Sequence, residues 1–186
     1  MSLSRLYSIA WVIKTEPFLA VLSTCCPHGF WAVGELGRLG YITTTFTGNV
    51  PDFDILVADK NLKAKFIQVK TIQRGGAFQS NVDKWMNITS KKKKQIILGK
   101  ARISTPGLIH IMVVLGDKYG EDEFYWLTKR QLQKAYFQSY SDWLKEHGGI
   151  RPRKPESHHC SVCPEELKAY RINWEEIIKK KSIFRT

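Results

Sequence analysis

The chain of 186 residues is 43% hydrophobic and 12% aromatic, which is enough apolar material for a folded domain and argues against global disorder. Its 29 lysine and arginine residues outnumber 17 acidic residues and give a net charge of +12. An excess of this size attracts polyanions, of which nucleic acid is the commonest, although a generically basic protein would carry the same charge.

The cysteine pattern and the hydropathy profile both argue against a secreted or membrane protein. Cys25 and Cys26 are adjacent, Cys160 and Cys163 are separated by two residues, and neither pair resembles a secreted disulfide framework. The apolar run at residues 6–13 is followed at once by charged residues and a proline, whereas a membrane span needs about 20 apolar residues. We therefore expect an intracellular, cytoplasmic protein with no membrane association.

The first part of the chain predicts one helix and a group of strands. Residues 1–27 are an N-terminal extension without a clear pattern. A short helix is predicted over residues 29–39, where apolar side chains recur about every three positions, and Gly40 ends it. β-Branched, aromatic and apolar runs then predict strands over residues 41–47, 53–58 and 64–72.

The second part of the chain changes from strand to helix. Residues 73–99 show loop residues and a short apolar piece around Trp85, and no regular element is predicted there. Apolar runs predict two further strands, over residues 108–115 and 123–127. A helix capped by Thr128 is predicted over residues 129–147, with a stop at Gly148. A basic connector and a last helix, over residues 164–181, complete the chain.

This order of elements predicts an α/β (α+β) fold with a mixed β-sheet flanked by helices. We expect a single domain over residues 1–186, since no repeat or linker divides it. Its parts are the extension at residues 1–27, a core at residues 28–128 and a helical C-terminal part at residues 129–186.

Three polar side chains occupy the second and third predicted strands. Asp54 heads an otherwise apolar strand, and Gln68 and Lys70 lie two apart on the next strand, on one face of the sheet. Bringing a carboxylate, an amide and an ammonium group together is costly unless they pair or bind a ligand. Oxygen ligands hold Mg²⁺, and a nearby lysine can stabilise a phosphoryl transition state. The pattern fits phosphodiester hydrolysis, and solvated edge strands are the alternative.

The motifs around these residues resemble those of a known superfamily. The segment GNVPDFD at residues 48–54 precedes three apolar residues, and Gln-Val-Lys-Thr follows at residues 68–71. Together they resemble the PD-(D/E)XK nuclease superfamily, and more narrowly its bacterial members with a Gln-x-Lys motif. The resemblance covers roughly residues 29–116. It implies a restriction endonuclease-like fold, a DNA substrate and Mg²⁺ or Mn²⁺ as cofactor.

The resemblance also assigns roles to individual residues. Asp54 corresponds to the metal-binding aspartate and Lys70 to the catalytic lysine. Gln68 occupies the place of the second acid, and the backbone carbonyl of Val69 would be a further metal ligand. Asp52 is the weaker choice of aspartate, because the aspartate of the family opens the apolar strand.

Two departures from the family pattern concern the metal site. Gln68 is neutral, which lowers the expected metal affinity, although the Gln variant occurs in active members. Many relatives place a glutamate on the first helix, whereas the nearest acid here is Glu35, more than one helical turn away from that place. Glu35 is therefore only a candidate ligand. A non-catalytic DNA-binding module that keeps the nuclease fold is the rival interpretation, and the homodimer common among relatives that cut both strands stays open.

Basic segments outside the motif are candidates for DNA contacts. They consist of Lys91, Lys92, Lys93, Lys94, Arg151 and Arg153. Runs of charge more often form solvated faces, so this alternative is kept beside phosphate binding. His110, within an apolar run, is expected to be a core residue rather than a catalytic base.

A second metal-ligand pattern lies near the C-terminus. Four potential soft-metal ligands fall within six residues: His158, His159, Cys160 and Cys163. A structural zinc site usually draws on two separated pairs of ligands, and the second pair would have to come from residues 25–26 or His147. A turn before the last helix is the simpler interpretation, and a zinc-stabilised interaction protein is kept as a third reading.

Overall fold

The computed structural model describes residues 27–46, 52–118 and 120–172. Residues 1–26 of the predicted N-terminal extension lie outside the described residues, and Pro27, its last residue, begins the first helix instead. The first helix, α2 (Pro27–Arg38), is followed by three consecutive strands that pair antiparallel with one another. They are β1 (Ile42–Thr45), β2 (Ile55–Ala58) and β3 (Ala64–Gln73). All four elements confirm the predictions for this part of the chain.

A five-stranded mixed sheet forms the centre of the molecule, in the order β1-β2-β3-β7-β8. Strand β7 (Ile109–Leu115) runs parallel to β3, and β8 (Glu123–Thr128) returns antiparallel to β7. The parallel register pairs Gln68 with His110 and Lys70 with Met112. The predicted mixed α/β class is confirmed by this sheet and its flanking helices.

The connection between β3 and β7 contains regular elements that the sequence did not predict. They are β4 (Phe78–Asn81), the 3₁₀ helix η3 (Val82–Lys84), β5 (Met86–Lys91) and β6 (Lys94–Lys100). Strands β5 and β6 form a hairpin whose turn residues, Lys92 and Lys93, have φ angles of 49° and 66°. Asn-Gly is the usual sequence signal for such a turn, so a pair of lysines gives no warning of it.

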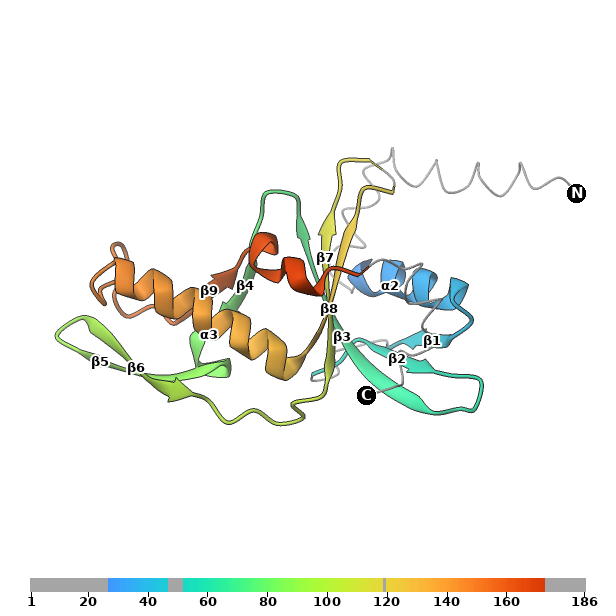
Figure 1. The fold of residues 1–186 in the computed structure, drawn as a ribbon, viewed down its shortest axis with the longest axis horizontal. Coiled ribbons are helices and arrows are strands. Elements are labelled where there is room, and N and C mark those ends of the chain that lie inside the picture. Colours follow the sequence, from blue (N-terminus) through green and yellow to red (C-terminus); the bar gives the residue numbers. More distant parts are fainter. Residues whose placement is uncertain (1–26, 47–51, 119, 173–186) are drawn as a thin grey trace, which may run out of the picture.

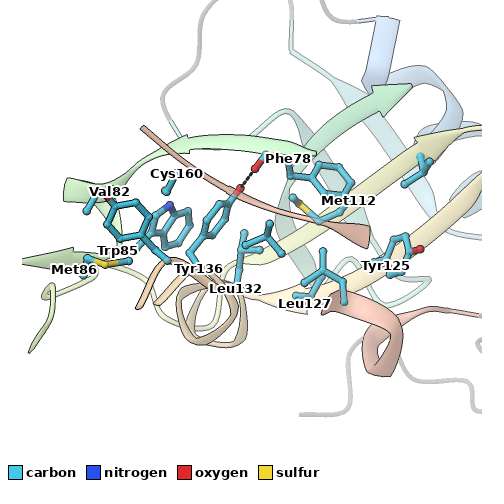
Figure 2. Packing of buried hydrophobic residues seen from close by; sticks show 14 of the residues in the cluster. Phe78, Val82, Trp85, Met86, Met112, Tyr125, Leu127, Leu132, Tyr136 and Cys160 are labelled. Atoms are coloured by element: carbon cyan, nitrogen blue, oxygen red, sulfur yellow. Dashed lines mark hydrogen bonds between the residues drawn. The ribbon is translucent and has the colours of Figure 1, made fainter. Parts of the chain in front are cut away.

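The two faces of the sheet pack against different helices. Figure 1 shows α2 on one side of strands β3, β7 and β8, and α3 (Lys129–Glu146) on the other. Side chains that alternate along the strands make two cores. The α2 side is filled by aliphatic residues, among them Leu36, Ile67 and Ile111. The α3 side is larger and more aromatic, with Trp85 stacked on Tyr136 at a ring distance of 4.7 Å (Figure 2).

Helix α3 begins and ends as its sequence predicts. The Thr128 hydroxyl accepts a hydrogen bond from the Gln131 N–H, and the Gln131 side chain accepts one from the Thr128 N–H, which makes a complete capping box. Gly148 and Gly149 follow the helix with φ angles of 61° and 85°, which a glycine adopts without strain. Among the described residues, no helix is both long and apolar enough to cross a membrane.

The C-terminal part is less helical than predicted. Strand β9 (His159–Val162) pairs with β4, and Pro164–Tyr170 forms a 3₁₀ helix, η4, instead of the first turns of a long α-helix. Arg171 then returns to an extended conformation and bridges Tyr125. The predicted helix over residues 164–181 is therefore wrong in its first part, because the chain leaves the helix to pair with the sheet. Its remainder lies outside the described residues.

Candidate active-site cleft

A cleft of about 520 Å³ opens on the α3 side of the sheet, beside the aromatic core. Strands β3 and β7 form its floor through Gln68, Lys70 and His110. Its walls come from the segment around η3, from residues 102–104 and from the start of α3. Charged side chains of both signs line it: Asp52, Asp54, Asp83, Lys70, Lys84, Arg102 and Lys129.

Asp54 directly precedes β2 and is held against β3 by two hydrogen bonds. Its N–H donates to the Ile67 carbonyl at 2.8 Å, and its carboxylate Oδ2 accepts from the Val69 N–H at 2.7 Å. The N–H and C=O of one strand residue point to the same edge, so the Val69 carbonyl also faces the end of β2 where Asp54 lies. The backbone thus brings the Asp54 carboxylate and the Val69 carbonyl to one edge of β3.

Lys70 lies on the cleft floor with its side chain half-buried. Its Nζ donates a hydrogen bond to the carbonyl oxygen of Gln79 in β4. Burial lowers the pKa of the Lys70 ammonium group, and the positive charge of Lys84 lowers it further. Such a lysine is an available proton donor and a desolvated positive charge, both of which suit phosphate chemistry.

His110 lies opposite Gln68 in the register and is only 4% exposed, as expected for a core residue. It also lines the cleft, which the sequence did not predict. Burial lowers its pKa to about 4, and the positive charge of Lys129 contributes, so the ring is neutral at pH 7. Within the described part of the chain, its buried Nε2 has no hydrogen-bond partner.

The oxygen donors at the cleft suit a hard divalent cation. They are the carboxylate of Asp54, the side-chain amide of Gln68 and the backbone carbonyl of Val69. Mg²⁺ commonly uses one or two carboxylates and keeps several waters, so this small set fits it. Across residues 27–46, 52–118 and 120–172, no three His, Cys, Asp or Glu side chains gather into a metal-binding group. The donor set is therefore sparse in negative charge.

Glu35 is placed apart from the other candidate ligands. It lies on α2, which packs against the opposite face of the sheet, and its carboxylate pairs with Arg38 at 3.3 Å. It is not among the described residues that line the cleft. The structure thus brings Asp54, Gln68, Val69 and Lys70 together and leaves Glu35 outside.

The cleft also contains charged residues that the sequence did not single out. Lys84 is the last residue of η3, Arg102 lies in the segment after β6, and Lys129 is the first residue of α3. Each is an ordinary basic residue in its own segment, and only the tertiary fold brings them around one site. No local sequence signal distinguishes them.

The predicted DNA-contact residues fall into two groups. Lys91, Lys92, Lys93 and Lys94 are all exposed at the end of the β5–β6 hairpin, and Arg153 is exposed in the connector after α3. Arg151 is instead engaged within the chain. Its guanidinium donates to the His159 carbonyl at 2.6 Å and lies 5.1 Å from the centre of the Trp143 ring.

The candidate zinc ligands of the described residues point to different partners. Cys160 lies in the aromatic core, where burial raises the pKa of its thiol to about 12, so it stays protonated. The His158 ring nitrogen Nδ1 lies 2.7 Å from the Asp83 carboxylate, and the ring of His147 stacks on Trp143. The side chains of His159 and Cys163 are exposed, and Cys25 and Cys26 lie outside the described residues.

Comparison with known proteins yields one structural likeness. No family model and no curated protein matches the chain. Among solved structures, the chain is similar to a bacterial homing endonuclease, with a TM-score of 0.41 and 11% sequence identity. The likeness covers 81% of this chain and 87% of that chain.

Proposed function

We propose that the chain is a metal-dependent endonuclease-like protein that hydrolyses phosphodiester bonds in DNA. The observation that carries the proposal is the grouping of Asp54, Gln68 and Lys70 at one cleft, with the Asp54 carboxylate fixed by the Val69 N–H at 2.7 Å. The two short motifs that resemble the PD-(D/E)XK superfamily supply exactly this set of side chains, and the net charge of +12 suits a polyanionic substrate.

The proposed division of labour follows the positions of the side chains. Asp54, Gln68 and the Val69 carbonyl would hold Mg²⁺ or Mn²⁺. When bound, such a cation neutralises charge on the phosphate and lowers the pKa of a water molecule. Lys70 would donate to a phosphate oxygen as negative charge develops on it. Because Lys70 is half-buried, its charge is less screened by solvent than that of a surface lysine.

The basic residues of the cleft walls support substrate binding. Lys84, Arg102 and Lys129 surround the proposed site and would contact phosphates on either side of the bond to be cut. Such contacts fix the register of the DNA backbone and carry no sequence information.

A second function is favoured by the sparse donor set. The neutral Gln68 and the position of Glu35 outside the cleft would both weaken metal binding. A non-catalytic DNA-binding module with the same fold would need no bound metal, so weak metal ligands would not impair it. This alternative predicts salt-dependent DNA binding that needs no metal and survives the loss of Asp54.

The test is cleavage of linear, supercoiled and branched DNA by the purified full chain with Mg²⁺, with Mn²⁺ and with EDTA. Asp54→Asn keeps an acceptor for the Val69 N–H but removes the charge, and Lys70→Ala removes the proposed transition-state donor. Each is expected to lower the cleavage rate by about 100-fold or more. Asp117→Asn and Lys118→Ala, matched changes at exposed residues of the β7–β8 loop, are expected to leave it unchanged.

Three results would decide against metal-dependent catalysis at this cleft. Cleavage that persists in EDTA, or in both Asp54→Asn and Lys70→Ala, would contradict the assignment. Binding without cleavage, unchanged in Asp54→Asn, would support the non-catalytic alternative.

A further inference from the structure

The β5–β6 hairpin arises from the rim of the cleft. Lys84 and Trp85 line the cleft and immediately precede β5, and Arg102 lines it shortly after β6. Figure 1 shows the hairpin extending from the centre of the molecule alongside α3 to one end of it. A ligand in the cleft therefore lies beside the base of this hairpin.

One side of the hairpin is anchored to the rest of the molecule. Ile88 and Ile97 pack against the aromatic core. The buried Gln95 side chain donates to the Pro155 carbonyl at 2.7 Å and accepts a hydrogen bond from the Tyr140 hydroxyl. At the base, the Gln133 amide of α3 donates to the carbonyls of Trp85 and Ala101. These contacts hold the hairpin as a fixed ribbon rather than a free loop.

The other side of the hairpin presents apolar and polar side chains to solvent. Ile96 and Leu98 alternate along β6 and are 43% and 66% exposed. Thr89, opposite Ile96 in the register, and Asn87 are also exposed. The solvent side of the ribbon thus combines two neighbouring aliphatic side chains with polar ones.

The charge of this region identifies the kind of partner. Residues 84–116 contain no Asp or Glu but include seven basic residues: Lys84, Lys91, Lys92, Lys93, Lys94, Lys100 and Arg102. Four of them sit at the exposed tip of the hairpin. A surface of this sign, in a chain with 17 acidic residues elsewhere, is complementary to a polyanion.

We propose that the β5–β6 hairpin is a recognition ribbon that lies in the major groove of duplex DNA. This inference rests on the proposed function, because the duplex that the hairpin contacts is the same DNA whose backbone enters the cleft. The major groove admits a two-stranded ribbon, and thymine methyl groups there accept apolar contacts. Ile96 and Leu98 supply such contacts, Asn87 and Thr89 supply hydrogen bonds to base edges, and the lysines at the tip contact phosphates.

The length of the ribbon sets the reach of the contact. Strand β6 has seven residues and so spans roughly 20 Å, at about 3.3 Å per residue. That distance corresponds to about six base pairs at 3.4 Å each. The lysines at the tip would therefore bind phosphates about half a helical turn away from the cleft.

The turn allows a charge change that does not weaken the fold. Lys92 and Lys93 have left-handed backbone conformations, which Asn and Gly adopt more readily. The double substitution Lys92→Asn/Lys93→Gly therefore removes two positive charges and should also stabilise the turn. Lys60→Gln/Lys63→Gln makes the same charge change at exposed residues of the turn between β2 and β3, which lies at the other end of the molecule (Figure 1). Leu98→Thr removes an exposed apolar contact and keeps a residue that favours strands.

The measurement is the affinity for a duplex of about three helical turns, in EDTA and as a function of salt, so that no cleavage is required. The slope of log K against log salt is negative, and loss of two phosphate contacts should make it less steep by about 1.8 in Lys92→Asn/Lys93→Gly. The slope should be unchanged in Lys60→Gln/Lys63→Gln. Leu98→Thr should weaken binding about tenfold for the preferred sequence and less for other sequences.

The outcomes separate this inference from the proposed function. A slope unchanged in Lys92→Asn/Lys93→Gly would overturn the inference, as would a Leu98→Thr variant that loses self-association but binds DNA like the original chain. DNA binding that depends on the ribbon, in a chain that never cleaves, would support the inference and contradict the nuclease function. A chain that does not bind duplex DNA at all would overturn both.

Discussion

The two faces of the ten-residue strand β3 have different surroundings, one in the core and the other at the cleft. Ile67 and Val69 point into the core beneath α2, where Leu36 and Ile111 are fully buried. Gln68 and Lys70 alternate with them and line the cleft on the other face. One strand can thus hold the sheet together with one face and present polar groups to a ligand with the other. Stability and function should then respond to different substitutions.

Shortening a side chain on the buried face should have the largest effect on stability. Ile67→Ala is expected to cost about 2–5 kcal/mol of the free energy of unfolding, because it leaves a cavity in a fully buried site. Gln68→Ala, its neighbour on the cleft face, should cost less than about 1 kcal/mol. Urea unfolding of both variants measures the difference. Equal losses would show that Gln68 is a structural residue and that the two faces are not separate.

His110 makes the stability of the cleft face depend on pH. Its pKa is lowered from 6.5 to about 4 in the folded chain, mainly by burial. The unfolded state therefore binds the proton first, so stability falls as the pH drops from about 6.5 towards 4. The shift corresponds to roughly 3 kcal/mol. His110→Leu should remove this part of the pH dependence, measured as urea unfolding midpoints between pH 4 and pH 7. An unchanged pH profile in the variant would contradict the lowered pKa.

Sequence patterns predicted the parts of the molecule that local chemistry determines. The aliphatic runs of β2 and β7, the alternation along β3 and the Thr128 cap of α3 each depend on residues close in sequence, and each was found where expected. The grouping of Asp54, Gln68, Val69 and Lys70 belongs to this class, because β2 and β3 are neighbouring strands joined by one short turn.

The parts that were missed depend on distant contacts. Strands β4 and β9 pair across 78 residues of chain or more, and each has only four residues, which is too short for a clear periodic signal. The hairpin turn at Lys92 and Lys93 lacks the usual glycine. At the C-terminal end, Pro164 and the acidic residues after it favour a helix start, but Arg171 pairs with the sheet and ends it.

The metal dependence of DNA cleavage by Gln68→Glu tests the central claim most directly. If Asp54 and Gln68 hold a divalent cation, a second carboxylate beside Asp54 should bind it more tightly. We predict that half-maximal cleavage needs roughly tenfold less Mg²⁺ in Gln68→Glu than in the original chain. The same Mg²⁺ requirement in both proteins, or no cleavage by either, would contradict a catalytic metal site at this cleft.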